Sequence, residues 1–299
     1  MKKIFNSIIT KLETNNKTSR FILKIIRILV KWKIFPLKKA NYLPAYGIFN
    51  IKIPGYNFSI KLESNGKDCI ANDLFWKGYS SFESNTTNLF LKLVKKSKII
   101  LDIGANNGYY SLLAAKYKPD AKIFAFEPVP RIYDQLIKNF SINNLKNITA
   151  FQAAVSDKTE DKILYIPKVD FPTSASLLEG FRDNVDKITC KTITIDNIFK
   201  DKINENIDLI KIDTEATEHK VLNGMTRILE NSSPNIICEI LANRNEKKIE
   251  SILKNYNYNF YWIKDDLTPM KEIIGDPTYK YKNYLFSRHD TYELKQFLE

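Results

Sequence analysis

Several features common in proteins are scarce or missing in this chain of 299 residues. Its three cysteines, Cys69, Cys190 and Cys238, are scattered and form no Cys-x-x-Cys pair. They provide no disulfide framework, so we expect a reducing, cytoplasmic setting. The N-terminal apolar stretch is interrupted by Lys and Arg and is followed by no small-residue cleavage site, so no signal peptide is expected. The same charges argue against a spanning helix, which needs about 20 mostly uncharged residues.

Two common nucleotide-binding motifs are also missing. No Gly-x-x-x-x-Gly-Lys-Ser/Thr segment occurs, which excludes a phosphate-binding P-loop. From Gly104 the chain reads Gly-Ala-Asn-Asn-Gly-Tyr, a spacing that differs from the Gly-x-Gly-x-x-Gly fingerprint of dinucleotide-binding proteins. A nucleoside ligand must therefore be argued from other residues.

Acidic residues are outnumbered by basic ones. There are 46 Lys and Arg against 34 Asp and Glu, which gives a formal charge of +12 at neutral pH. An excess of this size favours anionic partners such as nucleotide-linked substrates, nucleic acid or an acidic membrane surface. A generic solvated surface in a chain rich in Lys, Asn and Ile explains the same excess.

The most informative segment present is Ile99-Ile-Leu-Asp-Ile-Gly-Ala-Asn-Asn-Gly108. An apolar run predicts a buried strand that ends at Gly104, and a helical pattern begins just past Gly108. The two glycines let the backbone approach a ligand, and the new helix offers free N–H groups. Asp102 and Asn106 suit a ligand that carries an amino acid's ammonium and carboxylate. S-adenosylmethionine is such a ligand.

A second apolar strand, 121–126, ends in an acid. Glu127 follows it, 25 positions after Asp102. An acid at this place in a strand-helix-strand unit accepts hydrogen bonds from ribose hydroxyls. The pair of segments therefore predicts a nucleoside-cofactor site.

A third informative segment places four titratable groups within seven positions. They are Asp213, Glu215, Glu218 and His219, and they follow an apolar strand. Ligands of open α/β sheets lie beyond the carboxyl ends of the strands, so we expect this cluster at the same edge as Gly104. Glu239, at the end of the next apolar strand, points to the same edge. Helix capping explains one acid of the cluster, and we interpret the others as functional.

The order of the predicted elements indicates the fold class. We divide the chain into an N-terminal extension of helices and a β-hairpin, 1–82, and a second domain, 83–299. In the second domain strands and helices alternate, which predicts a mostly parallel, doubly wound sheet covered on both faces. The predicted strands of this domain are 99–103, 122–127, 148–155, 188–195, 207–213, 235–241, 258–263 and 282–287. Its predicted helices are 107–117, 131–140, 217–230 and 245–254, after a helical linker at 89–96.

The extension is predicted to contain helices 3–13 and 19–34 and a hairpin made of 48–53 and 58–62. In the second helix Arg20, Lys24, Arg27 and Lys31 form one basic stripe, and apolar residues cover the remaining circumference. Peripheral contact with an anionic membrane, such as the inner membrane face, is one interpretation. Packing on its own domain or on a second subunit, which would make a homo-oligomer, is the alternative that we favour.

These motifs together resemble one family. The segments 101–108, 125–130, 139–144, 154–157, 176–177 and 210–224 look like the FkbM-type S-adenosylmethionine-dependent methyltransferases, in order, over about residues 83 to 241. The resemblance implies a seven-strand, Rossmann-like methyltransferase sheet and O-methylation of sugar hydroxyls in glycan or natural-product pathways. It implies that Asp102, Gly104, Asn106 and Gly108 hold the methionine part of the cofactor. It also implies that Glu127, with Pro128 beside it, holds the ribose, and that Ala154 and Val155 contact the adenine.

The acceptor side of the site leaves alternatives open. The family usually reads Asp-x-Glu-Gly-x-Glu, and here Ala216 replaces the glycine, which puts the identity of the acceptor in doubt. A sugar hydroxyl benefits from a base, for which Asp213, Glu215, Glu218 and His219 are the candidates. Asp213 is also a candidate for contact with the cofactor. Asp213, Glu215 and Glu239 are the ligands for a divalent metal, should one be used. Ser176 and Glu239 are the candidates for substrate contacts.

We therefore expect an O-methyltransferase acting on an anionic small molecule or glycan, such as a nucleotide-linked sugar or a surface glycan precursor. Methylation of another acceptor, such as a phosphate-bearing small molecule or RNA, is the alternative. No nucleic-acid partner is expected, because basic residues are dispersed and the Asn/Asp-Pro-Pro-Tyr motif of base methylation is absent. A non-enzymatic, membrane-associated scaffold is disfavoured by the intact cofactor turn and acidic cluster.

Overall fold

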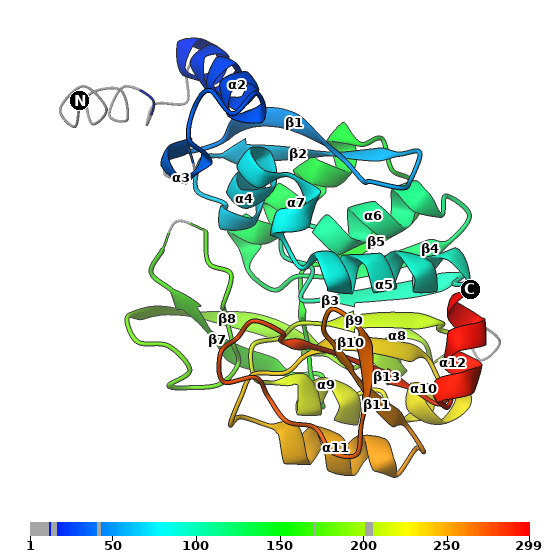
Figure 1. The fold of residues 1–299 in the computed structure, drawn as a ribbon. Coiled ribbons are helices and arrows are strands. Elements are labelled where there is room, and N and C mark those ends of the chain that lie inside the picture. The colour runs from blue at the N-terminus through cyan, green and yellow to red at the C-terminus, as the bar shows by residue number, and fades with distance from the viewer. Residues whose placement is uncertain (1–11, 13–16, 41–42, 170, 201–205) are drawn as a thin grey trace. The chain divides into compact units, whose positions relative to one another are not determined.

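The computed structural model describes residues 12, 17–40, 43–169, 171–200 and 206–299. The chain forms two compact units (Figure 1). The first contains Met1–Ser84 with Ser141–Asn143, and the second contains Asn85–Phe140 with Asn144–Glu299. Apart from Leu12, the helix predicted at 3–13 lies outside the described residues.

The first unit contains the predicted β-hairpin. Strands β1 (Tyr46–Lys52) and β2 (Ser59–Asn65) pair antiparallel, with buried and exposed residues alternating along both. This period of two is typical of a sheet with one face in a core. The helices of this unit are α2 (Lys17–Lys31), α3 (Leu37–Ala40) and α4 (Cys69–Lys77), followed by the 3-10 turn η1 (Tyr79–Ser81).

The second unit is built on an eight-stranded sheet in the order β12-β11-β13-β10-β9-β3-β4-β5. The strands from β10 to β5 in this order are parallel, whereas β13 pairs antiparallel with both β10 and β11. The predicted fold class, a mostly parallel Rossmann-like sheet, is confirmed, and β12 adds an eighth strand at one edge. The strands are β3 (Ile99–Ile103), β4 (Lys122–Phe126), β5 (Ile148–Phe151), β9 (Leu209–Ile212), β10 (Asn235–Glu239), β11 (Asn259–Ile263), β12 (Leu267–Met270) and β13 (Asn283–Ser287).

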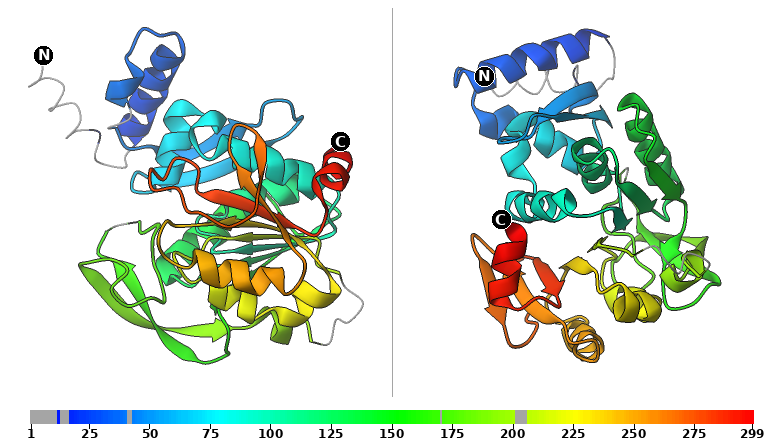
Figure 2. Two further views of the ribbon diagram at one scale, coloured as in Figure 1. Left: turned by 60° about the horizontal axis from the view of Figure 1, so that its bottom comes forward. Right: turned by 90° about the vertical axis from the view of Figure 1, so that its right-hand side faces the viewer.

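Helices cover both faces of this sheet (Figures 1 and 2). On one face lie α5 (Ser84–Lys95) and α6 (Tyr109–Tyr117), which touch through the rings of Phe90 and Tyr110. On the other lie α8 (Ile195–Ile198), α9 (Glu218–Asn223), α10 (Thr226–Asn231) and α11 (Glu246–Lys254). The remaining helices are α7 (Pro130–Ile142) and α12 (Thr291–Leu298). The main core lies between the sheet and α9 to α11, where alternate strand residues such as Leu101, Ile210 and Ile236 are buried.

Two predicted strands differ from the structure. The segment 148–155 divides into β5 and β6 (Ala154–Val155), and 188–195 belongs to β8 (Val185–Ile193) of a separate sheet. In that sheet β8 lies between β6 and β7 (Asp161–Pro167), a strand that the sequence analysis missed. The reason is visible in β8, where most residues are polar and at least partly exposed, unlike a central parallel strand, which is buried on both faces.

The helix predicted at 217–230 is broken at Gly224, between α9 and α10. A Cβ added at Gly224 would overlap the carbonyl oxygen of Ser156. The chain therefore needs a glycine where this turn passes close to the segment that follows β6.

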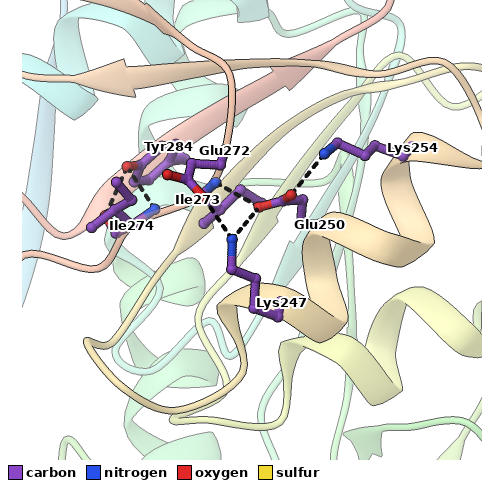
Figure 3. A network of polar contacts seen from close by, with 7 residues as sticks. All are labelled: Lys247, Glu250, Lys254, Glu272, Ile273, Ile274 and Tyr284. Carbon is purple, nitrogen blue, oxygen red and sulfur yellow. Dashed lines mark hydrogen bonds and ion pairs between the residues drawn. The ribbon is translucent and has the colours of Figure 1, made fainter.

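A polar network connects α11 to the segment that follows β12 (Figure 3). The carboxylate of Glu250 accepts hydrogen bonds from Lys254 at 2.7 Å and from the backbone N–H of Ile273 at 2.9 Å. Lys247 donates to Glu272 at 2.7 Å, and the hydroxyl of Tyr284 donates to the carbonyl of Ile274 at 2.8 Å. These contacts fix the segment that leads into β13. Lys282, just before β13, and Asn283, its first residue, belong to the site described next.

Candidate functional site

The carboxyl ends of β3, β4 and β9 meet at one edge of the large sheet. Gly104 has a φ of 80°, and a Cβ there would overlap the carbonyl oxygen of Asp213. The N–H of Asp213 donates to the carbonyl of Ile103 at 2.9 Å, and the N–H of Gly104 donates to that of Phe126 at 3.0 Å. The turn after β3 and the acidic segment after β9 are therefore in contact, as the sequence pattern predicts.

Asp102 connects β3 to α6. One of its carboxylate oxygens accepts hydrogen bonds from the N–H of Ser111 at 2.9 Å and from its hydroxyl at 2.6 Å. Burial raises the pKa of Asp102 to about 6, against the opposing effects of Ser111 and Lys211. Asp102 therefore fixes the start of the helix whose N-terminus faces this edge.

Glu127 is held in place by the backbone on both sides. One carboxylate oxygen accepts from the N–H of Asn106 at 2.9 Å, and the other accepts from the N–H of Val129 at 2.9 Å. Burial raises the pKa of Glu127 to about 7, although both hydrogen bonds favour the charged form. A pair of hydroxyl donors would favour that charged form further.

The turn between Gly104 and Gly108 is supported from two directions. Asn106 adopts a φ of 51°, and its side-chain oxygen accepts from the N–H of Asn107 at 2.8 Å. The side chain of Asn139 in α7 donates to the carbonyl of Asn107 at 2.8 Å. Asn107 and Asn139 are both buried, so contacts within the protein fix the shape of the turn.

The remaining residues assigned to the cofactor lie in two other segments of the second unit. Pro128 stands between β4 and α7, and Ala154 and Val155 form β6, where both are buried. The N–H of Ser156 just after them donates to the carbonyl of Ile193 at 2.9 Å. Their contacts with the cofactor stay predictions.

Lys211 is a charged residue of the site that the sequence analysis missed. It lies in β9, beside Asp102 of β3, and is almost completely buried. Its ammonium lies 3.6 Å from a carboxylate oxygen of Asp213 and 5.4 Å from the centre of the Tyr110 ring. The signal was a lysine within an otherwise apolar buried strand, where a charge needs a partner.

The segment after Asp213 has an unusual backbone. Glu215 and Ala216 adopt φ angles of 52° and 72°, a region that costs non-glycine residues about 1–2 kcal/mol each. The hydroxyl of Ser176 donates to the carbonyl of Glu215 at 2.6 Å and also accepts from the N–H of Leu178 at 3.1 Å. Ser176, predicted to contact the substrate, therefore holds this turn in place.

Glu218 is fully buried, and its carboxylate connects the acidic turn to α11. One oxygen accepts from the N–H and hydroxyl of Thr214 and from the N–H of Ala216, at 3.1–3.2 Å. The other accepts from the side chain of Asn245 at 2.6 Å. With both oxygens bonded and no exposure, Glu218 is placed to maintain the turn rather than to accept a substrate proton.

His219 is half-buried in α9. Its Nδ1 lies 3.4 Å from the side-chain nitrogen of Asn245. Burial lowers the pKa of His219, and Lys248 and Lys220 lower it further. These effects favour the neutral form of the His219 ring.

Glu239 is buried at the end of β10, where it lies near one acidic side chain, Asp213, and one basic side chain, Lys282. One of its oxygens forms an ion pair with Lys282, and a carboxylate oxygen of Glu239 lies within 4.8 Å of one from Asp213. Oε2 of Glu239 has no hydrogen-bond partner within the described part of the chain. Burial and the charge of Asp213 raise the pKa of Glu239 well above its usual value.

Asn283 lies opposite Glu239 in the antiparallel pairing of β10 with β13. Its side-chain oxygen is also buried without a hydrogen-bond partner among the described residues. Directly opposite residues of antiparallel strands present their side chains on the same face. The end of β10 therefore offers two polar oxygens that a bound hydroxyl could engage.

Glu215 is surrounded by charges of both signs. Burial and the charge of Asp213 raise the pKa of Glu215 to about 8, while the positive charges of Lys282 and Arg182 oppose this rise. Arg182 and Arg244 each place a guanidinium over the ring of Phe181, at 4.9 and 5.3 Å from its centre. The acidic turn thus has a pair of arginines beside it.

Comparison with known proteins identifies the type of domain. The Methyltransferase FkbM domain matches residues 102–260, which is more than half of the chain. The matched range begins at Asp102 and includes Glu127 and the whole acidic turn.

Two curated proteins are similar over part of their length. Methyltransferase sdnD of Sordaria araneosa is 30% identical in an alignment of 156 residues that covers 42% of this chain and 60% of that protein. Hexuronic acid methyltransferase AglP of Haloferax volcanii is 26% identical over 173 residues, 57% of this chain and 67% of that protein. The chain thus spans about two thirds or less of these two relatives.

A crystal structure of methyltransferase FkbM from Methylobacillus flagellatus is also similar. It aligns with a TM-score of 0.41 and 17% identity, over 64% of this chain and 43% of that one.

Proposed function

This chain belongs to the FkbM family of methyltransferases, and we propose that it transfers a methyl group from S-adenosylmethionine to a hydroxyl of an anionic sugar. The observation that carries the proposal is the contact between the turn after β3 and the acidic segment after β9, made at Gly104 and Asp213. This contact brings the turn that was predicted to bind the cofactor next to the acidic cluster that supplies the candidate bases. The cofactor predicted from the sequence agrees with this membership.

The residues at the edge fit the predicted cofactor. Glu127, oriented by two backbone N–H groups, suits a ribose diol, because a carboxylate accepts from both hydroxyls. Asp102 and Asp213 supply negative charge for an ammonium group, and Lys211 limits the repulsion between them. When bound, S-adenosylmethionine supplies an electrophilic methyl group. The protein contributes a preformed cradle, so much of its catalytic effect is positioning.

A base beside the acceptor hydroxyl is the second requirement. Asp213 is partly exposed, with 32% of its side chain accessible, and Glu215 has a pKa of about 8. A carboxylate whose pKa lies near the pH of the reaction is an effective general base, because part of it is unprotonated and the proton it accepts is bound firmly. Because Glu218 is fully bonded, we assign the proton transfer to Asp213 and Glu215 as a pair, since the charge of Asp213 helps to raise the pKa of Glu215.

The acceptor is proposed to carry a carboxylate or phosphate. Arg182 and Arg244 are exposed and, within the described part of the chain, neither guanidinium forms an ion pair. Their shared contact with the buried ring of Phe181 gives both a fixed direction, and Arg182 acts electrostatically on Glu215. Guanidinium groups bind carboxylates and phosphates through paired hydrogen bonds. The similarity to a hexuronic acid methyltransferase supports this choice.

The experiment measures methylation of four acceptors: UDP-glucuronate, UDP-glucose, methyl glucuronoside and methyl glucoside. Each is assayed with wild type, with Arg182→Gln and Arg244→Gln, and with Arg227→Gln as a matched control, since Arg227 is exposed in α10 away from Phe181. We expect the Phe181-associated variants to raise KM about tenfold for the acceptor group that they recognise and to leave cofactor affinity unchanged.

The four acceptors separate two sources of negative charge. If the sugar carboxylate is recognised, both glucuronates lose affinity in the two variants, whereas recognition of the pyrophosphate affects both UDP sugars. Equal KM values for all four acceptors, or equal losses in Arg227→Gln, would contradict an anionic acceptor. Methylation of RNA in place of every sugar would contradict the proposal as a whole.

A further inference from the structure

Helix α2 has an apolar stripe that the described part of the chain leaves exposed. Phe21, Ile25, Ile28 and Trp32 are 65%, 42%, 50% and 68% exposed. Trp32 directly follows the last residue of α2, and its N–H still donates to the carbonyl of Ile28 at 3.0 Å. The spacing of four, three and four therefore places these residues on one line. Single exposed apolar residues are ordinary, but four large ones in line on one helix mark an interaction surface.

The opposite face of α2 is already used within the first unit. Leu23 and Ile26 are buried, and the guanidinium of Arg27 lies 4.5 Å from the centre of the Phe75 ring and 5.8 Å from that of Phe49. This inner face fixes the helix on its own unit. The stripe is therefore a second apolar face, held outward by the packing of the first.

The charge around the stripe has one sign. Lys17, Lys24 and Lys31 are exposed and, by helical geometry, line one border of the stripe. The sequence contains no Asp or Glu from residue 14 to residue 62, whereas it contains ten Lys and Arg in that range. The surface that carries the stripe is thus basic and has no acidic residue of its own nearby in the sequence.

We propose that α2 binds the surface of an anionic lipid bilayer, with Phe21, Ile25, Ile28 and Trp32 in the headgroup region and the lysines against the lipid charges. A helix with one apolar stripe bordered by lysines suits this position. A second copy of the chain fits less well, because a symmetric contact would bring two stripes bordered by lysines together. Within the described residues, no helix has the length and apolar character to cross a bilayer.

The experiment is vesicle flotation of the full-length protein, with mixed phosphatidylcholine–phosphatidylglycerol vesicles and with pure phosphatidylcholine. We expect binding to the mixed vesicles only, weakening as salt is added. Lys24→Gln with Lys31→Gln should weaken binding about fivefold for each lysine, the effect of about 1 kcal/mol per basic residue. Ile28→Ser should weaken it about tenfold or more, since an apolar side chain no longer leaves water.

Two controls identify the surface and the state of the protein. Ile163→Ser, at a residue 43% exposed in β7, should leave vesicle binding unchanged, and all variants should keep the wild-type unfolding temperature because the altered residues are exposed. Trp32 reports insertion, since its fluorescence should shift to the blue on mixed vesicles and the shift should be lost in Trp32→Phe.

Three results would overturn the proposal. Equal binding to pure phosphatidylcholine would exclude charge as the reason. A wild-type dimer that Ile28→Ser converts to a monomer would assign the stripe to a second copy of the chain. Wild-type binding by Ile28→Ser would exclude the stripe as the contact. None of these readouts depends on methyl transfer, so they stand whether or not the proposed acceptor is right.

Discussion

Ala216 and Phe181 belong to one small buried apolar cluster, although the backbone at Ala216 has a φ of 72°. Ala216 is buried, and Leu241 completes the same small cluster. The residue that departs from the usual glycine of the family therefore connects the acidic turn to the aromatic ring on which Arg182 and Arg244 rest. The sequence predicts that a methyl group at this position affects the acceptor side of the site. The structure gives it apolar neighbours there, Phe181 and Leu241.

The first prediction follows from this packing. Ala216→Gly removes backbone strain of about 1–2 kcal/mol. It also loses the buried methyl, about 0.8 kcal/mol, and adds freedom to the unfolded chain, about 0.5–1 kcal/mol. We expect the free energy of unfolding in urea to change by less than about 1 kcal/mol, and the acceptor KM to rise because the cluster that contains Phe181 loses a methyl group. Ala216→Val should instead destabilise the protein by about 2 kcal/mol or more, since a branched residue tolerates this φ poorly. An unchanged stability of Ala216→Val would contradict the strained backbone.

The second prediction concerns the pH dependence of cofactor binding. Glu127 has a pKa of about 7 in the free protein, and ribose hydroxyls donate to its charged form. Affinity for S-adenosylmethionine should therefore be constant above about pH 7 and fall by up to tenfold per unit below it. Calorimetry should show this slope in wild type. In Glu127→Gln, affinity should be lower by about 1.5–3 kcal/mol, and the part of the slope that Glu127 causes should be lost. The same slope in both proteins would assign it to another group.

The third prediction concerns stability at the end of β10. The pKa of Glu239 is raised in the folded protein, so the folded state binds this proton more tightly than the unfolded chain does. The resulting stabilisation is complete below the ordinary pKa of a glutamate and is lost as the pH rises through the raised pKa. Glu239→Gln should therefore raise the unfolding temperature relative to wild type by more at about pH 8 than at about pH 5. Glu230→Gln, at an exposed position, is the matched control and should show no such difference. A smaller effect at the higher pH would mean that the ion pair with Lys282 dominates.

The fourth prediction separates two neighbouring acids. Glu218→Ala leaves the N–H groups of Thr214 and Ala216 and the side chain of Asn245 without their acceptor, so we expect a loss of about 3 kcal/mol in the free energy of unfolding. Glu215→Ala should keep most of its stability and its affinity for the cofactor but lose about 100-fold or more in turnover. Urea unfolding and steady-state kinetics measure both quantities. Equal stability of the two variants would contradict the structural role given to Glu218.

The sequence was sufficient for the parts of the site that local chemistry determines. The glycines of 104 and 108, the acid after β4 and the acid after β9 stand at strand ends, and parallel strands bring their carboxyl ends to one edge. Contacts between residues far apart in the chain could not be predicted from the sequence. Glu239 meets Lys282 only because β13 runs antiparallel to β10, and Glu218 meets Asn245 only through the packing of α9 on α11.

The same limit explains the other differences. The segment 188–195 has the composition of a strand, but its polar alternation places it in the smaller sheet rather than between the parallel strands. In α2, the apolar residues cover more of the helix than one interface can bury, and which of them face outward depends on the rings of Phe49 and Phe75.

The most direct test of the account is the mass of the acceptor after incubation with S-adenosylmethionine carrying a labelled methyl group. We predict that a sugar acceptor, UDP-glucuronate before UDP-glucose, gains one labelled methyl group on oxygen. In Asp213→Asn this gain should fall about 100-fold or more, while calorimetry still detects the cofactor bound. Wild-type methylation by Asp213→Asn, or bound cofactor with no labelled sugar from any acceptor, would contradict the account.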